Sequence, residues 1–145
     1  MKISKIRDVK TPTRGTPDSA GIDFYVPNVD FDYAIPVNGS LIIPSGIKAN
    51  VPPGYALIAF NKSGVATKKG LSVGACVVDE DYQGEIHIHL FNNTRFPVII
   101  NPGEKIVQFI LIPVFTDTIE EVPLKELYDS NTVRGEGWQG STGIN

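Results

Sequence analysis

Three neighbouring acids, Asp79, Glu80 and Asp81, are the part of the sequence best suited to do chemistry. They stand between the apolar run CVV at 76–78 and the segment YQG at 82–84. A carboxylate held at the end of a strand can take a proton from a water molecule or help to bind a metal ion. We expect Asp79 to end a strand and to be partly shielded from water, which favours an ordered base or ligand. A solvated turn without a chemical role is the alternative.

The residues after these acids predict a turn and then a strand. Residues 81–84 have the composition of a β-turn, in which Gly84 is free to take a positive φ. The segment EIHIHLF at 85–91 alternates apolar and polar residues, which is typical of a strand with one buried face.

Two further segments are suited to binding an anion. In NKSGVATKKG, Lys62, Ser63 and the N–H of Gly64 lie at a possible helix start, where free N–H groups and the helix dipole attract negative charge. The alternative is an ordinary helix cap by Ser63. The order of residues is not that of a Walker A loop.

The other anion-binding candidate is the glycine-rich segment near the C-terminus, RGEGWQGSTG at 134–143. Its glycines let backbone N–H groups converge, Arg134 adds a bidentate cation, and Ser141 and Thr142 add hydroxyl donors. Trp138 can stack on a base. The segment lacks a core-forming pattern, so we expect a mobile arm, and a terminus without function is the alternative.

Four other polar residues have weaker signals. His87 and His89 are two apart on a strand and can project together, but we expect them to line its polar face rather than bind a metal. We expect Cys76 to be a small packed residue. Asp23, in AGIDFY, is either a turn aspartate or a group that supports Mg²⁺ through water.

The elements that must position these residues are mostly short strands. The sequence contains 14 glycines and 11 prolines, and their turn signals separate β-prone runs at 40–43, 47–51, 55–60, 85–91, 96–100 and 105–115. This spacing predicts an all-β sandwich, jelly roll or barrel. Helix is expected only over 63–70, closed by Gly70, and for about one turn within 123–129.

Composition limits the classes of function. A chain of 145 residues is long enough for one domain with its own core, which we place at 1–130, followed by the arm at 131–145. A net charge of −3 without a basic run argues against nucleic-acid or membrane partners. A single cysteine and a start without an apolar signal region favour the cytoplasm, with a nucleus or an organelle left open.

Five stretches, in order along the chain, resemble the motifs of the trimeric dUTPase family. They are AGIDFY (20–25), KSGVATKKG (62–70), GACVVDEDYQGE (74–85), GEKIVQ (103–108) and RGEGWQGSTG (134–143). The resemblance covers nearly the whole chain, and the third motif is the most specific. It implies a jelly-roll-like β-barrel or sandwich subunit, the dUTPase-like β-clip, with one short helix and a mobile C-terminal arm.

The resemblance also implies a function. The family hydrolyses dUTP to dUMP and pyrophosphate with Mg²⁺, which limits uracil in DNA and supplies dUMP for dTMP synthesis. It implies a homotrimer whose active sites are shared between neighbouring subunits. A dCTP deaminase-like or bifunctional enzyme of the same fold is one alternative. A nucleotide-gated regulatory binding protein is another, and a regulatory protein partner is left open.

The family motifs assign roles residue by residue. Asp79 matches the aspartate that activates water for attack on the α-phosphate, Tyr82 packs on the deoxyribose, and Asp23 supports the metal through water. The other expected substrate contacts are Lys62, Ser63, Gly64 and Gln108 at the phosphates, Cys76, Val77, Ile86 and His87 around uracil, and Arg134, Trp138, Gln139, Gly140, Ser141 and Thr142 in the arm.

The chain departs from the family at several of these positions. Lys62 and Lys105 stand where the family usually has Arg, and lysine keeps the charge but loses the bidentate fork. Asn61 replaces a usual Pro, and Cys76 an often-found Gly. In the arm the aromatic residue comes one position early, at Trp138, so we expect a shift of register that lets Trp138 cover the base.

Overall fold

The structure, a computed structural model, describes residues 1–137. Contacts between residues divide the chain into two units, Met1–Phe115 and Thr116–Asn145, which are described separately. The described part of the second unit contains one short 3-10 helix, η1 (Leu124–Glu126), within the segment where about one turn was expected. The division into a domain over 1–130 and an arm over 131–145 stays a prediction.

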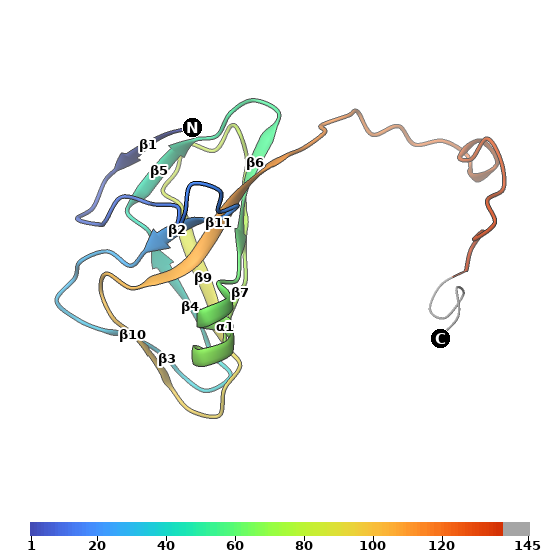
Figure 1. Cartoon of the computed structure of the whole chain (residues 1–145). Coiled ribbons are helices and arrows are strands. Elements are labelled where there is room, and N and C mark those ends of the chain that lie inside the picture. The colour runs from blue at the N-terminus through green and yellow to red at the C-terminus, as the bar shows by residue number, and fades with distance from the viewer. Residues whose placement is uncertain (138–145) are drawn as a thin grey trace. The chain divides into compact units, whose positions relative to one another are not determined.

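The first unit consists of short strands and one α-helix, which confirms the predicted all-β class with a single short helix (Figure 1). Its elements are β1 (Lys2–Lys5), β2 (Ile22–Tyr25), β3 (Tyr33–Ile35), β4 (Ser40–Pro44), β5 (Ile47–Asn50), β6 (Tyr55–Phe60), α1 (Ser63–Lys69), β7 (Leu71–Val73), β8 (Val77–Val78), β9 (His87–Asn92), β10 (Val98–Ile100) and β11 (Lys105–Pro113).

The strands form two larger sheets and two small ones. The larger sheets have the orders β2-β11-β6-β8 and β4-β9-β7, and the small ones are the pairs β1-β5 and β10-β3. All of the pairings are antiparallel. The pair β1-β5 lies at one end of the unit and the pair β10-β3 at the other (Figure 1).

Both larger sheets contribute to one hydrophobic core. Phe24 of β2 and Phe109 of β11 are almost fully buried, with their ring centroids 4.5 Å apart. In β9 the burial alternates as expected, with Ile88 and Leu90 each 1% exposed. Ile86, just before that strand, is buried on the same side. The sheets therefore pack as a sandwich around these side chains.

The helix α1 begins and ends close to its predicted limits. Gly70 ends it in the left-handed conformation with φ 63°, as predicted. A Cβ atom there would lie 2.3 Å from Cγ2 of Thr94, so this position also lacks room for a side chain. The alternative of a helix cap by Ser63 is wrong, because Lys62 is the N-cap residue and makes no side-chain capping bond. None of the helices in residues 1–137 is long and apolar enough to cross a membrane.

Three strands were not predicted from the sequence, and two predicted strands start later than expected, since the run at 96–100 forms a strand only from Val98. The missed strands β1, β3 and β7 are at most four residues long, which is too short for a clear alternation. The strand predicted at 85–91 begins at His87, because the backbone of Ile86 bonds instead to Ser45 and to Ile47, the first residue of β5.

Candidate active site

A pocket of about 250 Å³ lies beside the acid-containing hairpin. Its lining residues are Ala75, Cys76, Val77, Val78, Tyr82, Ile86, His87 and Phe109. Five of these, Cys76, Val77, Tyr82, Ile86 and His87, were expected around the nucleoside. Phe109 was not predicted as a site residue, because the apolar run that contains it indicates only a buried strand. The volume is below the roughly 300–1,000 Å³ typical of small-molecule pockets, so the pocket suits one ring rather than a whole nucleotide.

Backbone hydrogen bonds hold the two walls of this pocket in place. On one side, the N–H of Ala59 donates to the carbonyl of Cys76 at 2.8 Å. On the other, the N–H of Ile86 donates to Ile47 at 2.9 Å, and its carbonyl accepts from Ser45 at 3.0 Å. The walls are therefore set by the sheets rather than by a free loop.

The acids occupy a turn that differs from the expected one. The turn runs from Asp79 to Tyr82, whose N–H donates to the Asp79 carbonyl at 3.2 Å, and Gly84 does not take a positive φ. Glu80 accepts a hydrogen bond from the N–H of Gly54 at 2.6 Å. Asp79 directly follows β8, as predicted, but it is exposed in the chain by itself, so the expected shielding from water is wrong here.

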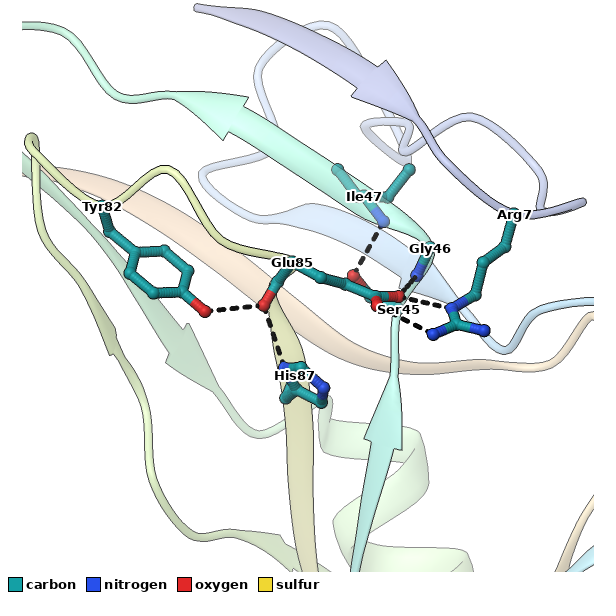
Figure 2. Close-up of polar contacts among 7 residues, drawn as sticks. All are labelled: Arg7, Ser45, Gly46, Ile47, Tyr82, Glu85 and His87. Carbon is teal, nitrogen blue, oxygen red and sulfur yellow. Dashed lines mark hydrogen bonds and ion pairs between the residues drawn. The ribbon is translucent and has the colours of Figure 1, made fainter.

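Glu85 connects the hairpin to the rest of the unit (Figure 2). The Arg7 guanidinium donates to its two carboxylate oxygens at 2.7 and 2.9 Å, and the N–H of Gly46 donates to one of them at 2.8 Å. The backbone carbonyl of Glu85 accepts the Tyr82 hydroxyl at 2.9 Å and contacts Nδ1 of His87 at 2.9 Å. Since a carbonyl only accepts, Nδ1 of His87 carries the hydrogen.

The carboxyl of Glu85 is also shifted in its acidity. Hydrogen bonds from Arg7 lower its pKa, burial opposes them, and the Gly46 N–H lowers it further, with a net pKa below the usual glutamate value. The same hydrogen bonds raise the pKa of Arg7, so this pair stays ionised near neutral pH.

This pKa shift predicts how stability depends on pH. A depressed folded-state pKa gives stability that is complete above the unfolded pKa of about 4.3 and is lost as pH falls through the folded-state pKa. We therefore expect the free energy of unfolding of the wild type to drop more steeply below about pH 4.3 than that of Arg7→Met, in which the pair is absent. Urea titrations between pH 7 and pH 3 measure both curves. Parallel curves would show that the pair does not contribute.

A second group of polar residues lies at the opposite end of the same sheet. Asp23 of β2 is 4% exposed, so it is not a turn residue. One of its carboxylate oxygens pairs with the ammonium of Lys62, and the other lies 3.2 Å from Nζ of Lys105. The two lysines that replace the family's usual arginines thus meet at one buried carboxylate, which the sequence did not reveal.

Gln108 and the start of α1 complete this group. Gln108 lies opposite Asp23 on one side and Phe60 on the other, and its amide donates to the carbonyl of Asn61 at 2.8 Å. Ser63 and Gly64 follow Lys62 directly and are exposed. The group therefore presents two ammonium groups, one carboxylate and the start of a helix.

The two groups are separated both along β6 and across the sheet. Leu57 and Val78 are paired, so Asp79 follows the pair near the start of β6, whereas Phe60 ends the strand at the Gln108 side. Asp79 lies near Ala56, so about 13 Å of β6 separates it from Phe60, and three strand spacings of about 4.8 Å each separate β8 from β2 across the sheet. Asp79 and the lysine group of one chain are therefore far apart compared with the length of a triphosphate.

No cluster of three His, Cys, Asp or Glu side chains suited to a metal occurs within residues 1–137. The two histidines have separate contacts. His89 is half-buried, packs on Phe91 with ring centroids 4.6 Å apart, and accepts from the N–H of Ala75 at 3.1 Å. His87 is exposed, and within residues 1–137 its side chain makes a hydrogen bond only to the carbonyl of Glu85.

The predicted arm residues belong to the second unit or lie outside the described residues. The Arg134 guanidinium donates to the carbonyl of Gly137 at 3.2 Å, and Gly135 has φ 48°. The remaining predicted arm contacts, which lie outside the described residues, are Trp138, Gln139, Gly140, Ser141 and Thr142.

Comparison with known proteins agrees with these observations. The dUTPase family model matches residues 7–143, and the chain belongs to this family. Among its relatives is the deoxyuridine 5'-triphosphate nucleotidohydrolase of Yarrowia lipolytica, 38% identical over 147 residues that span 100% of this chain and 90% of the relative. The enzyme of the same name from Paramecium bursaria Chlorella virus 1 is 40% identical over 140 residues, covering 96% of this chain and 94% of the relative.

Solved structures confirm the fold. A mutant dUTPase of Staphylococcus bacteriophage 80alpha with dUpNHpp superimposes with a TM-score of 0.87 at 20% identity, over 99% of this chain and 98% of that one. A mutant dUTPase of phage phi11 of S. aureus, described with a structural Mg(II) ion, gives a TM-score of 0.75 at 19% identity, over 83% of this chain and 95% of that one. The predicted dUTPase-like β fold is therefore confirmed.

Proposed function

We propose that the chain hydrolyses dUTP to dUMP and pyrophosphate. The observation that carries this proposal is a ring-sized pocket with Asp79 in the turn at its side, in a chain of the dUTPase family. The names of the relatives at 38–40% identity, deoxyuridine 5'-triphosphate nucleotidohydrolase, support the same substrate and reaction.

Asp79 is the proposed general base. Its carboxylate accepts a proton from a water molecule, and the resulting nucleophile attacks the α-phosphate. The turn that carries Asp79 is held from both sides, because Glu80 is bonded to Gly54 and Tyr82 to Glu85. These contacts keep the base at a set place relative to the pocket.

The pocket is proposed to bind the deoxyuridine part. Uracil enters between the wall that contains Cys76 and Val77 and the wall that contains Ile86 and His87. Bonded walls of this kind leave little room for a methyl group on the ring, which disfavours thymine by steric exclusion. Tyr82 packs on the deoxyribose and excludes a 2′-hydroxyl.

The lysine group is proposed to bind the phosphates. Asp23 contributes one negative charge and Lys62 and Lys105 contribute two positive charges, so this end of the sheet is net cationic. Positioning and charge neutralisation are the main protein contributions to phosphoryl transfer. The other proposed phosphate contacts are Ser63, Gly64 and Gln108, together with Arg134, Gln139, Gly140, Ser141 and Thr142 of the arm, with Trp138 over the base.

Asp23 is proposed to support a Mg²⁺ ion indirectly, and the ion would neutralise charge on the substrate phosphates. The chain offers no direct ligand set within residues 1–137, but Mg²⁺ retains waters and is often held largely by substrate phosphates. Two oxygens of Asp23 are engaged by lysines, and a carboxylate has about four acceptor positions, so Asp23 can still accept from metal-bound waters. The residues thus fit an indirect role, in which the ion neutralises phosphate charge.

A homotrimer with shared sites is proposed as the active form. Asp79 and Asp23 of one chain are separated by about 13 Å along β6 and by three strand spacings of about 4.8 Å across the sheet, which is more than the phosphate chain of one nucleotide spans. If the pocket and base of one copy lie beside the lysines of another copy, the nucleoside contacts the first copy and the phosphates contact the second. The exposure of Asp79 supports this arrangement, since a neighbouring copy would cover it.

Product analysis tests the proposed reaction. The full chain is incubated separately with dUTP, dCTP, dTTP and UTP, with Mg²⁺ or with EDTA, and the products are separated by ion-exchange chromatography. We expect dUMP and pyrophosphate from dUTP alone, and a large loss of rate with EDTA. Conversion of dCTP to a uracil nucleotide would instead indicate a deaminase, and tight dUTP binding without turnover would indicate a regulatory binding protein.

A further inference from the structure

The hydroxyl of Tyr82 donates to the backbone carbonyl of Glu85, whose side-chain carboxylate forms an ion pair with Arg7. In Figure 2, Glu85 lies between Tyr82 and Arg7. Tyr82 donates to the Glu85 carbonyl at 2.9 Å, and the Glu85 carboxylate receives two hydrogen bonds from Arg7 and one from Gly46. The Glu85 side chain is 12% exposed, so this pairing is largely protected from water.

The ring of Tyr82 has a defined place as well as a bonded hydroxyl. A Cβ atom on Gly84 would lie 2.4 Å from Cζ of Tyr82, so the ring packs directly on the Gly84 backbone. Tyr82 belongs to the lining of the pocket of about 250 Å³ and also to that of a second pocket of about 440 Å³, which Lys48 and Gln83 line as well. Its position therefore affects the shape of both pockets.

Tyr82 as a residue is nevertheless 44% exposed, so packing alone does not hold its ring. The hydroxyl bond is the contact that fixes the ring, and it depends on the direction of the Glu85 carbonyl. That direction is set by the Glu85 carboxylate bonds and by the Ile86 N–H, which donates to Ile47 at 2.9 Å. Bidentate Arg–carboxylate pairs have strict geometry, which suits them to such positioning.

We propose that Arg7 and Glu85 are positioning residues that hold Tyr82 against the sugar and thereby set the preference for deoxyribose over ribose. The inference rests on the proposed function, in which Tyr82 packs on the deoxyribose. A ring excludes a 2′-hydroxyl only while it cannot move aside. Without the ion pair the ring can turn toward the second pocket, and the additional hydroxyl is then tolerated.

The experiment compares dUTP with UTP in Arg7→Met, Tyr82→Phe and the double variant. Arg7 is exposed by 49%, so its replacement leaves the core intact. We expect each single variant to reduce the ratio of kcat/KM for dUTP to that for UTP by about tenfold, a change of the size expected for one lost hydrogen bond. Where kcat/KM for dUTP itself falls, the fall should come from a higher KM, with kcat nearly unchanged. The double variant should match the single ones, because both changes break the same chain of contacts.

Two further variants distinguish positioning from general destabilisation. Glu104→Gln is the matched control, since the Glu104 side chain is 27% exposed and pairs with Lys69 away from Tyr82. It should leave the dUTP-to-UTP ratio unchanged. Glu85→Gln keeps an acceptor for the Gly46 N–H but loses the charge. Its dUTP-to-UTP ratio of kcat/KM should therefore lie between those of the wild type and Arg7→Met.

Hydrogen exchange gives a measurement that needs no nucleotide. We expect Arg7→Met to speed amide exchange in residues 79–87 and Glu104→Gln to leave it unchanged. An unchanged dUTP-to-UTP ratio in Arg7→Met, or additive effects of Arg7→Met and Tyr82→Phe, would overturn the proposal. If the wild type fails to hydrolyse dUTP in the same assay, the proposed function has failed instead, and the exchange data still report on the positioning of the hairpin.

Discussion

Replacing Asp79 with Asn should lower kcat for dUTP by about 10²- to 10⁴-fold, the usual contribution of a general base. The amide has nearly the same shape but cannot accept a proton from water. It should therefore leave the pocket and the binding of the non-hydrolysable analogue dUpNHpp nearly unchanged. Steady-state pyrophosphate release measures kcat, and calorimetric titration with the analogue measures binding.

Asp81→Asn is the matched control for this experiment. Asp81 belongs to the same exposed turn and has the same side chain, but no hydrogen bond or ion pair joins it to the pocket in the described residues. Its replacement should change kcat by less than about threefold, as is usual for surface positions away from special features. An equal loss in both variants would mean that the charge of the turn, rather than a positioned base at Asp79, supports the reaction.

The parts of the fold that depend on neighbouring residues were predictable from the sequence. The alternation of Ile86, Ile88 and Leu90 identified a buried strand face, and Gly70 identified the end of α1, because both signals lie within a few residues of the feature they define. The short strands β1 and β3 gave no such signal. Their pairing depends on partners more than 40 positions away.

The same distinction explains which parts of the site were predictable. Asp79 was identified because an apolar strand ends directly before it. Arg7 was not identified, because its partner Glu85 is 78 positions away and only the folded sheets bring them together. Likewise, the strand register that sets Gln108 opposite Asp23 is what brings Lys62 and Lys105 to one carboxylate. Contacts of this kind follow from the topology, which single-residue patterns do not encode.

The lysine group has a consequence for stability as well as for the substrate. Asp23 is buried, and both of its oxygens are paired with ammonium groups. Lysine ammonium groups are strongly hydrated point charges, so each must be compensated where water is scarce. The Lys62 side chain is 21% exposed and that of Lys105 is 52% exposed. Lys62 therefore depends on Asp23 more than Lys105 does.

Asp23→Asn should lower the free energy of unfolding by about 2–3 kcal/mol, because charge-assisted hydrogen bonds are lost and a half-buried ammonium is left without its counter-charge. It should also raise KM for dUTP, since Lys62 is no longer held toward the phosphates. Denaturant titration measures the first effect and steady-state kinetics the second. Adding Lys62→Met to Asp23→Asn should recover part of the lost stability, because it removes the ammonium group that has lost its counter-charge. Adding Lys105→Met should recover less. If Lys62→Met is as destabilising in Asp23→Asn as in the wild type, the two side chains are not coupled and Asp23 is buried for another reason.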